Sequence, residues 1–196
     1  MRKSKPQKST DRLLRLGIFN TADAIRNGVS QPTISRLTAR GEILRLAHGL
    51  YQHPLAKIDP SEVDFAIAYK KFGPKSAVGG LSALFRYGLI SQVPDRIWVI
   101  VPSAVKSTDP LYRCIRTKHS SKVGIENHCF YRMTTIERTL IESLRFATKI
   151  GLGIAVSATR KALKERKTTK KKIYEMAKAM KLDKILAEHW ESIAEE

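Results

Sequence analysis

The fold is decided by residues 18–51, which read IFNTADAIRNGVSQPTISRLTARGEILRLAHGLY. Thr21 is placed to cap a short helix, and Asn27–Gly28 predicts its end, because glycine accepts the left-handed conformation of a tight turn. Val29 is expected to fill the space beneath that turn. A short helix and a glycine turn directly before a further helix favour a helix-turn-helix.

The helix after the turn carries the pattern that matters most for function. Ser30 is its expected N-cap, and Pro32 lies in its first turn, where a missing N–H group is tolerated. Ile34 and Leu37 are three residues apart and predict the inward face, while Gly41 predicts the helix end. The other side chains of this helix are short hydrogen-bonding groups and arginines, which predicts a polar outer face.

Two short strands are predicted next, Ile43–Leu46 and Leu50–Gln52, with a tip at Ala47–Gly49. This order of elements is that of a winged helix-turn-helix, which we expect over residues 1–56. The second helix of such a motif enters the major groove of DNA. We therefore expect contacts to double-stranded DNA from the polar side chains of that helix and of the ribbon, which are Ser30, Gln31, Thr33, Ser35, Arg36, Arg40, Arg45 and His48.

The charge of the chain agrees with a nucleic-acid partner. Its 196 residues contain 36 lysines and arginines against 18 acidic residues, a formal net charge of +18. Residues 1–56 alone contain ten basic residues against three acidic ones. Such an excess favours a polyanion, because cations that meet phosphates release condensed counterions. The alternative for this half is a winged helix that contacts another protein.

Composition excludes several other classes. The hydrophobic content of 42% is ordinary for a globular protein, and no apolar run is long enough for a membrane span. Cys114 and Cys129 are the only cysteines and lack metal-ligand spacing, which favours two buried thiols in a reducing cytoplasm. We expect a cytoplasmic protein with no metal and no cofactor.

Residues 57–196 predict a second domain that is rich in helix and contains a small β-sheet, so the whole chain is expected to be mainly helical α+β. Asp59–Pro60 is a helix-start signal. The stretch 96–101 is dense in β-branched and aromatic residues and predicts a strand. Weaker strands are predicted at 112–117 and 129–133.

Further helices are expected between and after these strands. One lies within residues 76–90 and is closed by Gly88. Another opens with capping-box spacing from Thr134 to Glu137. Two more are predicted at 151–166 and 169–192.

No catalytic motif emerges from the second domain. Its histidines are scattered, no phosphate-binding glycine loop is complete, and no nucleophile elbow is present. We therefore do not expect an enzyme. The alternative is a nuclease-like enzyme fused to a winged-helix DNA reader, with a cleft that holds two carboxylates, such as Asp95 with Glu126 or Glu137.

The stretch 160–172 contains eight cations and the single anion Glu165. One interpretation is a solvated helix junction, with Leu163 and Ile173 turned toward the core. The other is a second polyanion-binding patch for DNA backbone or RNA. Both interpretations stay open for its cations, which are Arg160, Lys161, Lys164, Arg166, Lys167, Lys170, Lys171 and Lys172.

Four stretches, spread over about residues 10–145, carry a resemblance to a known family. They are the wing GEILRLAHGLY at 41–51, Ser82–Leu84 leading to Tyr87–Leu89, Pro94 followed by Ile97–Pro102, and Ile136–Leu140. With these stretches the chain resembles the AbiEi-type antitoxins of type IV bacterial toxin–antitoxin systems, also described as AbiEi-like transcriptional regulators. The tail after residue 147 matches no motif of that family.

The resemblance implies a protein with two roles. The N-terminal winged helix of such proteins binds repeats in the promoter of its own operon and represses it. The C-terminal domain counteracts a nucleotidyltransferase-like toxin and requires no stable complex with it. Systems of this type act in phage defence. The antitoxin role is implied by the resemblance alone.

Overall fold

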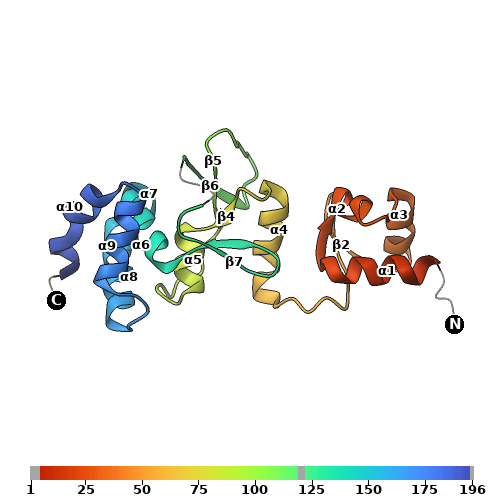
Figure 1. Ribbon diagram of the computed structural model, residues 1–196, viewed down its shortest axis with the longest axis horizontal. Coiled ribbons are helices and arrows are strands. Elements are labelled where there is room, and N and C mark those ends of the chain that lie inside the picture. Colours follow the sequence, from red (N-terminus) through yellow and green to blue (C-terminus); the bar gives the residue numbers. More distant parts are fainter. Residues whose placement is uncertain (1–4, 119–121, 195–196) are drawn as a thin grey trace. The chain divides into compact units, whose positions relative to one another are not determined.

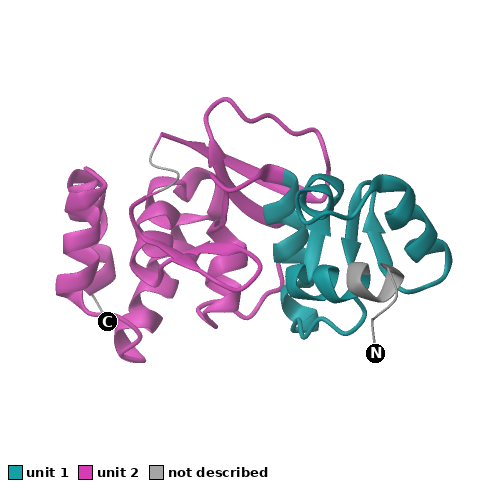
Figure 2. Ribbon diagram, turned by 45° about the vertical axis from the view of Figure 1, so that its right-hand side comes forward, with its two compact units in different colours: residues 1–71 teal, residues 72–196 magenta. Residues whose placement is uncertain are grey.

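The computed structural model describes residues 5–118 and 122–194. The chain divides into two units, residues 1–71 and 72–196 (Figure 2). The fold class is mainly helical α+β, as the sequence predicts.

Unit 1 begins with the winged helix-turn-helix (Figure 1). Its elements are α1 (Lys5–Leu16), β1 (Ile18–Asn20), α2 (Thr21–Arg26), α3 (Gln31–Ala39), β2 (Leu44–Ala47) and β3 (Leu50–Gln52). The strands form an antiparallel sheet in the order β1-β3-β2. Strand β1 is an addition to the predicted elements, because it forms by pairing with β3, a strand distant from it in the chain.

The core of this motif confirms the predicted inward positions. Ile34 and Leu37 of α3 and Val29 of the turn are each at most 2% exposed. They form one cluster with Leu13, Phe19, Ala24 and Ile43. Gly28 and Gly41 end α2 and α3 in the left-handed conformation, with φ of +74° and +70°.

The N-cap of α2 corrects the sequence prediction. The cap is Asn20 and not Thr21, because Asn20 and Asp23 form a reciprocal capping box. The Asp23 N–H donates to Asn20 Oδ1 at 2.7 Å, and the Asn20 N–H donates to Asp23 Oδ2 at 3.3 Å. The last residue of β1 is therefore also the first cap of the helix-turn-helix.

Unit 1 ends with the 3-10 turn η1 (Pro60–Glu62) and most of helix α4 (Val63–Phe72). Asp59 caps this start, as expected, by accepting a hydrogen bond from the Ser61 N–H at 2.9 Å. Lys70 of α4 pairs with Asp23 of α2 at 2.7 Å. This ion pair ties α4 to the winged helix, and the division between the units falls before the last residue of α4, Phe72.

Unit 2 combines a sheet with a helical layer. Its elements are β4 (Ala77–Val78), α5 (Gly80–Arg86), β5 (Ile97–Pro102), β6 (Tyr112–Thr117), β7 (Ile125–Asn127), β8 (Arg132–Thr134), α6 (Ile136–Arg145), α7 (Ala147–Ile150), α8 (Leu152–Lys164), α9 (Lys170–Ala179) and α10 (Asp183–Ala194). The sheet order is β6-β5-β4-β8-β7. It is mixed: β5 runs parallel to β6 and β4 parallel to β8, whereas the other neighbours are antiparallel.

Two predictions near β8 are wrong in detail. Thr134 ends the strand and pairs with Ile125, so the cap of α6 is Thr135, which accepts from the Arg138 N–H. The strand predicted at 129–133 begins only at Arg132. Cys129 therefore lies before the strand and is exposed rather than buried, and Cys114 is half-buried.

The helical layer of unit 2 centres on α6, which contacts α5, α8, α9 and α10. Figure 1 shows α8, α9 and α10 gathered at the C-terminal end of this unit. Leu140, Ile141 and Leu144 of α6 are buried, as predicted. The helix predicted at 169–192 is instead two helices, α9 and α10. Among the described residues, no helix has the length and apolar character to cross a bilayer.

Candidate nucleic-acid interface

Helix α3 presents a polar face away from the core of its unit. Gln31, Ser35, Arg36 and Arg40 are exposed, whereas the buried Ile34 and Leu37 occupy the opposite side. The spacing of 3.6 residues per turn separates these two faces. Amide, hydroxyl and guanidinium groups are the side chains that read base edges and contact phosphates. The face has the size and chemistry that a major groove admits.

The N-terminal end of α3 has its own hydrogen bonds. Ser30 is exposed, and its Oγ lies 2.9 Å from Thr33 Oγ1. Thr33 is half-buried and also accepts from Arg36 Nη2 at 3.4 Å. The Ser30 hydroxyl therefore does not cap the helix N–H groups. Thr33 lies on the flank of the face, beside the Arg36 guanidinium.

The wing formed by β2 and β3 carries two further predicted contacts. Arg45 Nη2 lies 3.3 Å from His48 Nδ1, and Arg45 Nε donates to the Ala47 carbonyl at 3.4 Å. Both side chains are exposed. The wing tip is tied to the start of α2, because the Thr21 N–H donates to the Gly49 carbonyl at 3.2 Å. The structure thus places the Arg45 guanidinium beside a hairpin tip that is hydrogen-bonded to α2.

Arg40 lies at the C-terminal end of α3 and follows the predicted outward direction. Its Nη1 lies 3.8 Å from Glu42 Oε1, and 63% of the Arg40 side chain is exposed. An exposed pair at this distance is weak. Arg40 therefore keeps its capacity to contact a phosphate.

Arg12 of α1 is a cation at the turn between α2 and α3 that the sequence did not single out. Its Nη1 donates to the Asn27 carbonyl at 3.4 Å, in the turn between α2 and α3. A Cβ on Gly28 would lie 2.7 Å from the same nitrogen. The packing of α1 is what brings Arg12 to this turn.

The Asp23 carboxylate is part of the capping box at the start of α2. Burial on its own raises the pKa of Asp23. The hydrogen bonds from Lys70 and from the Asn20 N–H, with the charges of Lys70 and Arg26, outweigh burial and hold the pKa below its ordinary value of 3.8. Asp23 is therefore a structural anion within the basic unit.

The basic stretch 160–172 lies on three consecutive segments of unit 2: the end of α8, the turn after it and the first turn of α9. All eight of its cations are exposed except Lys161, which is half-buried. Ile173 is buried and Leu163 half-buried, which confirms their inward direction. Glu165 lies 2.8 Å from Lys167 and 3.9 Å from Lys161. The hydrogen bond from Lys167 lowers the pKa of the Glu165 carboxyl.

The carboxylates considered for an enzymatic site have separate partners. Asp95 pairs with Arg96 at 3.6 Å, Glu126 accepts from the Tyr87 hydroxyl at 3.3 Å, and Glu137 accepts from the Thr168 hydroxyl at 2.7 Å. Within residues 5–118 and 122–194, no three His, Cys, Asp or Glu side chains gather as a metal site would require.

A comparison with protein families now bears on this interface. Residues 11–54 match the family described as "Transcriptional regulator, AbiEi antitoxin". The match runs from α1 through the wing and so covers the whole helix-turn-helix, which confirms the resemblance for this segment. The other stretches with AbiEi-like residues, from Ser82 to Leu140, lie outside the match. No curated protein matches the chain.

Proposed function

We propose that the chain is a DNA-binding autorepressor and the antitoxin of a type IV toxin–antitoxin system, and that it acts in the bacterial cytoplasm in phage defence. The observation that carries the DNA-binding role is the exposed polar face of α3, which the AbiEi match includes. We assign base or adjacent phosphate contacts to Gln31, Thr33, Ser35 and Arg36. Ser30, Arg40, Arg45 and His48 then hold the backbone.

The charge of this segment supports DNA over a protein partner. The candidate contacts include three arginines, of which Arg40 lies 3.8 Å from Glu42 in an exposed and weak pair. Arg36 and Arg45 are exposed, and each makes one long contact of 3.4 Å, to Thr33 Oγ1 and to the Ala47 carbonyl, so both guanidinium groups are available to a phosphate.

The first test is promoter binding by the double variant Arg36→Ala/Arg45→Ala. Each lost contact is expected to weaken binding by about 1–3 kcal/mol, so the pair costs about 2–6 kcal/mol at fixed salt. Fluorescence anisotropy with the DNA upstream of the gene measures the loss. The matched control is Arg116→Ala/Lys118→Ala, which removes the same charge from exposed positions of unit 2. Equal affinity of both double variants at the promoter would refute the assignment.

The antitoxin role rests on the family name matched by residues 11–54, together with the AbiEi-like stretches of unit 2. The partner that this role implies is a nucleotidyltransferase-like toxin, with which no stable complex is required. Unit 2 is the part of the chain that we assign to this neutralisation.

Co-expression tests the antitoxin role. Expression of a nucleotidyltransferase-like gene adjacent to this one is expected to arrest growth, and co-expression of the full chain to restore it. The variant Arg36→Ala/Arg45→Ala is expected to restore growth as well, because its substitutions lie in unit 1. Growth arrest that persists in the presence of the folded chain would exclude an antitoxin function.

A further inference from the structure

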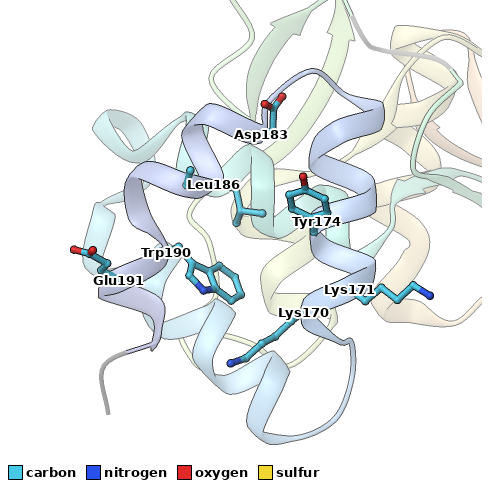
Figure 3. A pocket seen from close by; sticks show the side chains of 8 residues that line it. Lys170, Lys171, Tyr174, Asp183, Leu186, Trp190 and Glu191 are labelled. Atoms are coloured by element: carbon cyan, nitrogen blue, oxygen red, sulfur yellow. The ribbon is translucent and has the colours of Figure 1, made fainter.

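A cavity of about 580 Å³ lies between helices α9 and α10 (Figure 3). Tyr174 and Lys170 of α9 line it on one side and Leu186 and Trp190 of α10 on the other, with Lys170 close to the Trp190 ring. Its volume falls in the range of small-molecule pockets. Such a cavity accommodates a planar group the size of a nucleobase.

The walls of this cavity are fixed by the core of unit 2. Ile173 and Ala177 anchor α9, and Leu186 and Ile193 anchor α10, each at most 5% exposed. Arg160 Nη2 donates to the Ser192 carbonyl at 2.6 Å and so fastens α8 to α10. The aromatic side chains therefore stand on a rigid support before a ligand binds.

The aromatic rings of the cavity are accessible. Tyr174 is 56% exposed and Trp190 is half-buried. Lys170 Nζ lies 5.7 Å from the centre of the Trp190 ring. The ammonium group sits on a flexible stem, and a base stacked on tryptophan is generally worth more than an exposed cation–π contact. A base can therefore replace the Lys170 ammonium group on the face of the Trp190 ring, and Lys170 can then contact a phosphate.

Charge is distributed unequally over the two walls. The α9 wall carries Lys170 and Lys171, whereas Asp183 and Glu191 line the α10 side. Beyond the rim the cations continue along the basic stretch. Within the part of the chain that the structure describes, Lys164, Arg166 and Lys172 have no ion-pair partner. Lys171 lies 3.9 Å from Glu175, an exposed and therefore weak pair. This arrangement suits a phosphate on the α9 side of a stacked base.

We propose that this cavity and the adjoining basic stretch bind single-stranded nucleic acid, with a base stacked on Trp190 and Tyr174 and phosphates on Lys170 and Lys171. Proteins that bind single strands without sequence preference combine exposed aromatic rings with a positively charged groove. The site lies entirely within unit 2 and does not depend on the promoter binding proposed above.

Tryptophan fluorescence of the full chain tests the stacking directly, with a short oligodeoxythymidylate as the probe. The other tryptophan, Trp98, is only 5% exposed, so quenching on titration reports on Trp190. We expect quenching in the unmodified chain. Trp190→Phe is expected to lose the quenching but to retain binding by anisotropy.

Affinity measurements separate stacking from charge. Tyr174→Ala and Trp190→Ala are each expected to weaken oligonucleotide binding about tenfold, and Lys170→Gln/Lys171→Gln to reduce its salt dependence. Phe85→Ala, which removes an exposed aromatic ring from α5, is the control and is expected to bind normally. Tyr174→Ala leaves the buried core intact, so its result stands even if Trp190→Ala unfolds.

Three outcomes with the unmodified chain and the cavity variant would overturn the proposal, and a fourth concerns the winged helix. They are absence of binding by the unmodified chain, full affinity of folded Tyr174→Ala, and competition by polyglutamate as strong as that by the oligonucleotide. The winged helix provides the final control. Arg36→Ala/Arg45→Ala is expected to keep its affinity for the single strand, and Tyr174→Ala its affinity for the promoter. Loss of oligonucleotide binding in the unit 1 variant would mean that the winged helix binds the oligonucleotide, which would contradict the proposed site.

Discussion

Arg138 is a charged residue whose role is visible only in the structure. It belongs to the AbiEi-like stretch Ile136–Leu140, but its side chain is fully buried. Its guanidinium donates to Glu142 at 2.9 Å and to the Val123 carbonyl at 2.6 Å. Breaking a buried ion pair of this kind costs about 3–5 kcal/mol. Arg138 therefore acts on the stability of unit 2, where it joins α6 to the segment before β7.

Asp23 provides a residue-scale prediction in unit 1. Its pKa in the folded chain lies below 3.8, so its carboxylate stabilises the fold above that pH, and the stabilisation is lost as the pH falls through the folded pKa. Asp23→Asn is expected to lower the free energy of unfolding by about 1–2 kcal/mol at neutral pH, because it weakens the cap and the Lys70 pair. Urea denaturation over the acid range measures this difference, which is expected to shrink below pH 3.8.

The control for this measurement is Asp64→Asn, an exposed carboxylate in the first turn of α4. We expect a much smaller change from it. A loss for Asp23→Asn that stays constant down to strongly acidic pH would show that the charge of Asp23 is not the stabilising feature.

At the scale of elements, helices α8 and α9 both end without glycine. Arg166 and Lys181 adopt the left-handed conformation, with φ of +55° and +56°. After α9, the Lys181 N–H donates to the Lys178 carbonyl at 3.0 Å and the Leu182 N–H to the Ala177 carbonyl at 2.8 Å. This pattern is a Schellman motif, whose left-handed position glycine normally occupies. The sequence therefore contains no visible signal for the break between α9 and α10.

Lys181→Gly is expected to stabilise the chain by about 0.5–1 kcal/mol, because glycine adopts the left-handed conformation without the steric cost of a Cβ. Thermal unfolding followed by circular dichroism measures the gain as a higher Tm. The matched control is Lys178→Gly, which lies within α9 and is expected to destabilise by about 1 kcal/mol. A lower Tm for Lys181→Gly would argue against the left-handed helix end.

At the scale of the whole molecule, the charge of +18 is shared by both units. Unit 1 carries cations on α3, the wing and α1, and unit 2 carries the basic stretch between α8 and α9. The chain thus has two separate cationic surfaces, which we assign to a duplex and to a single strand. Each surface has its own geometry: a convex helix face in unit 1 and a cavity with aromatic walls in unit 2.

Salt dependence tests this division. Arg45→Ala is expected to reduce the slope of log K against log salt by about one for promoter DNA, because one phosphate contact is lost. The slope for a single-stranded oligonucleotide is expected to remain unchanged. Arg116→Ala serves as the control for total charge and is expected to change neither slope. Equal changes from Arg45→Ala with both ligands would mean that the two share one surface.

The sequence by itself determined the helix-turn-helix, the wing and the polar face of α3, because local signals decide them: the glycines at 28 and 41, the proline at 32 and the spacing of Ile34 and Leu37. It also predicted strand β5 and the inward side of α6. Only the tertiary structure decided β1, the caps at Asn20 and Thr135, the position of Arg12 and the cavity beside Trp190. Each of these depends on contacts between residues distant in the chain or on competition between a strand and a helix for the same residue, and neither leaves a periodic pattern in the sequence.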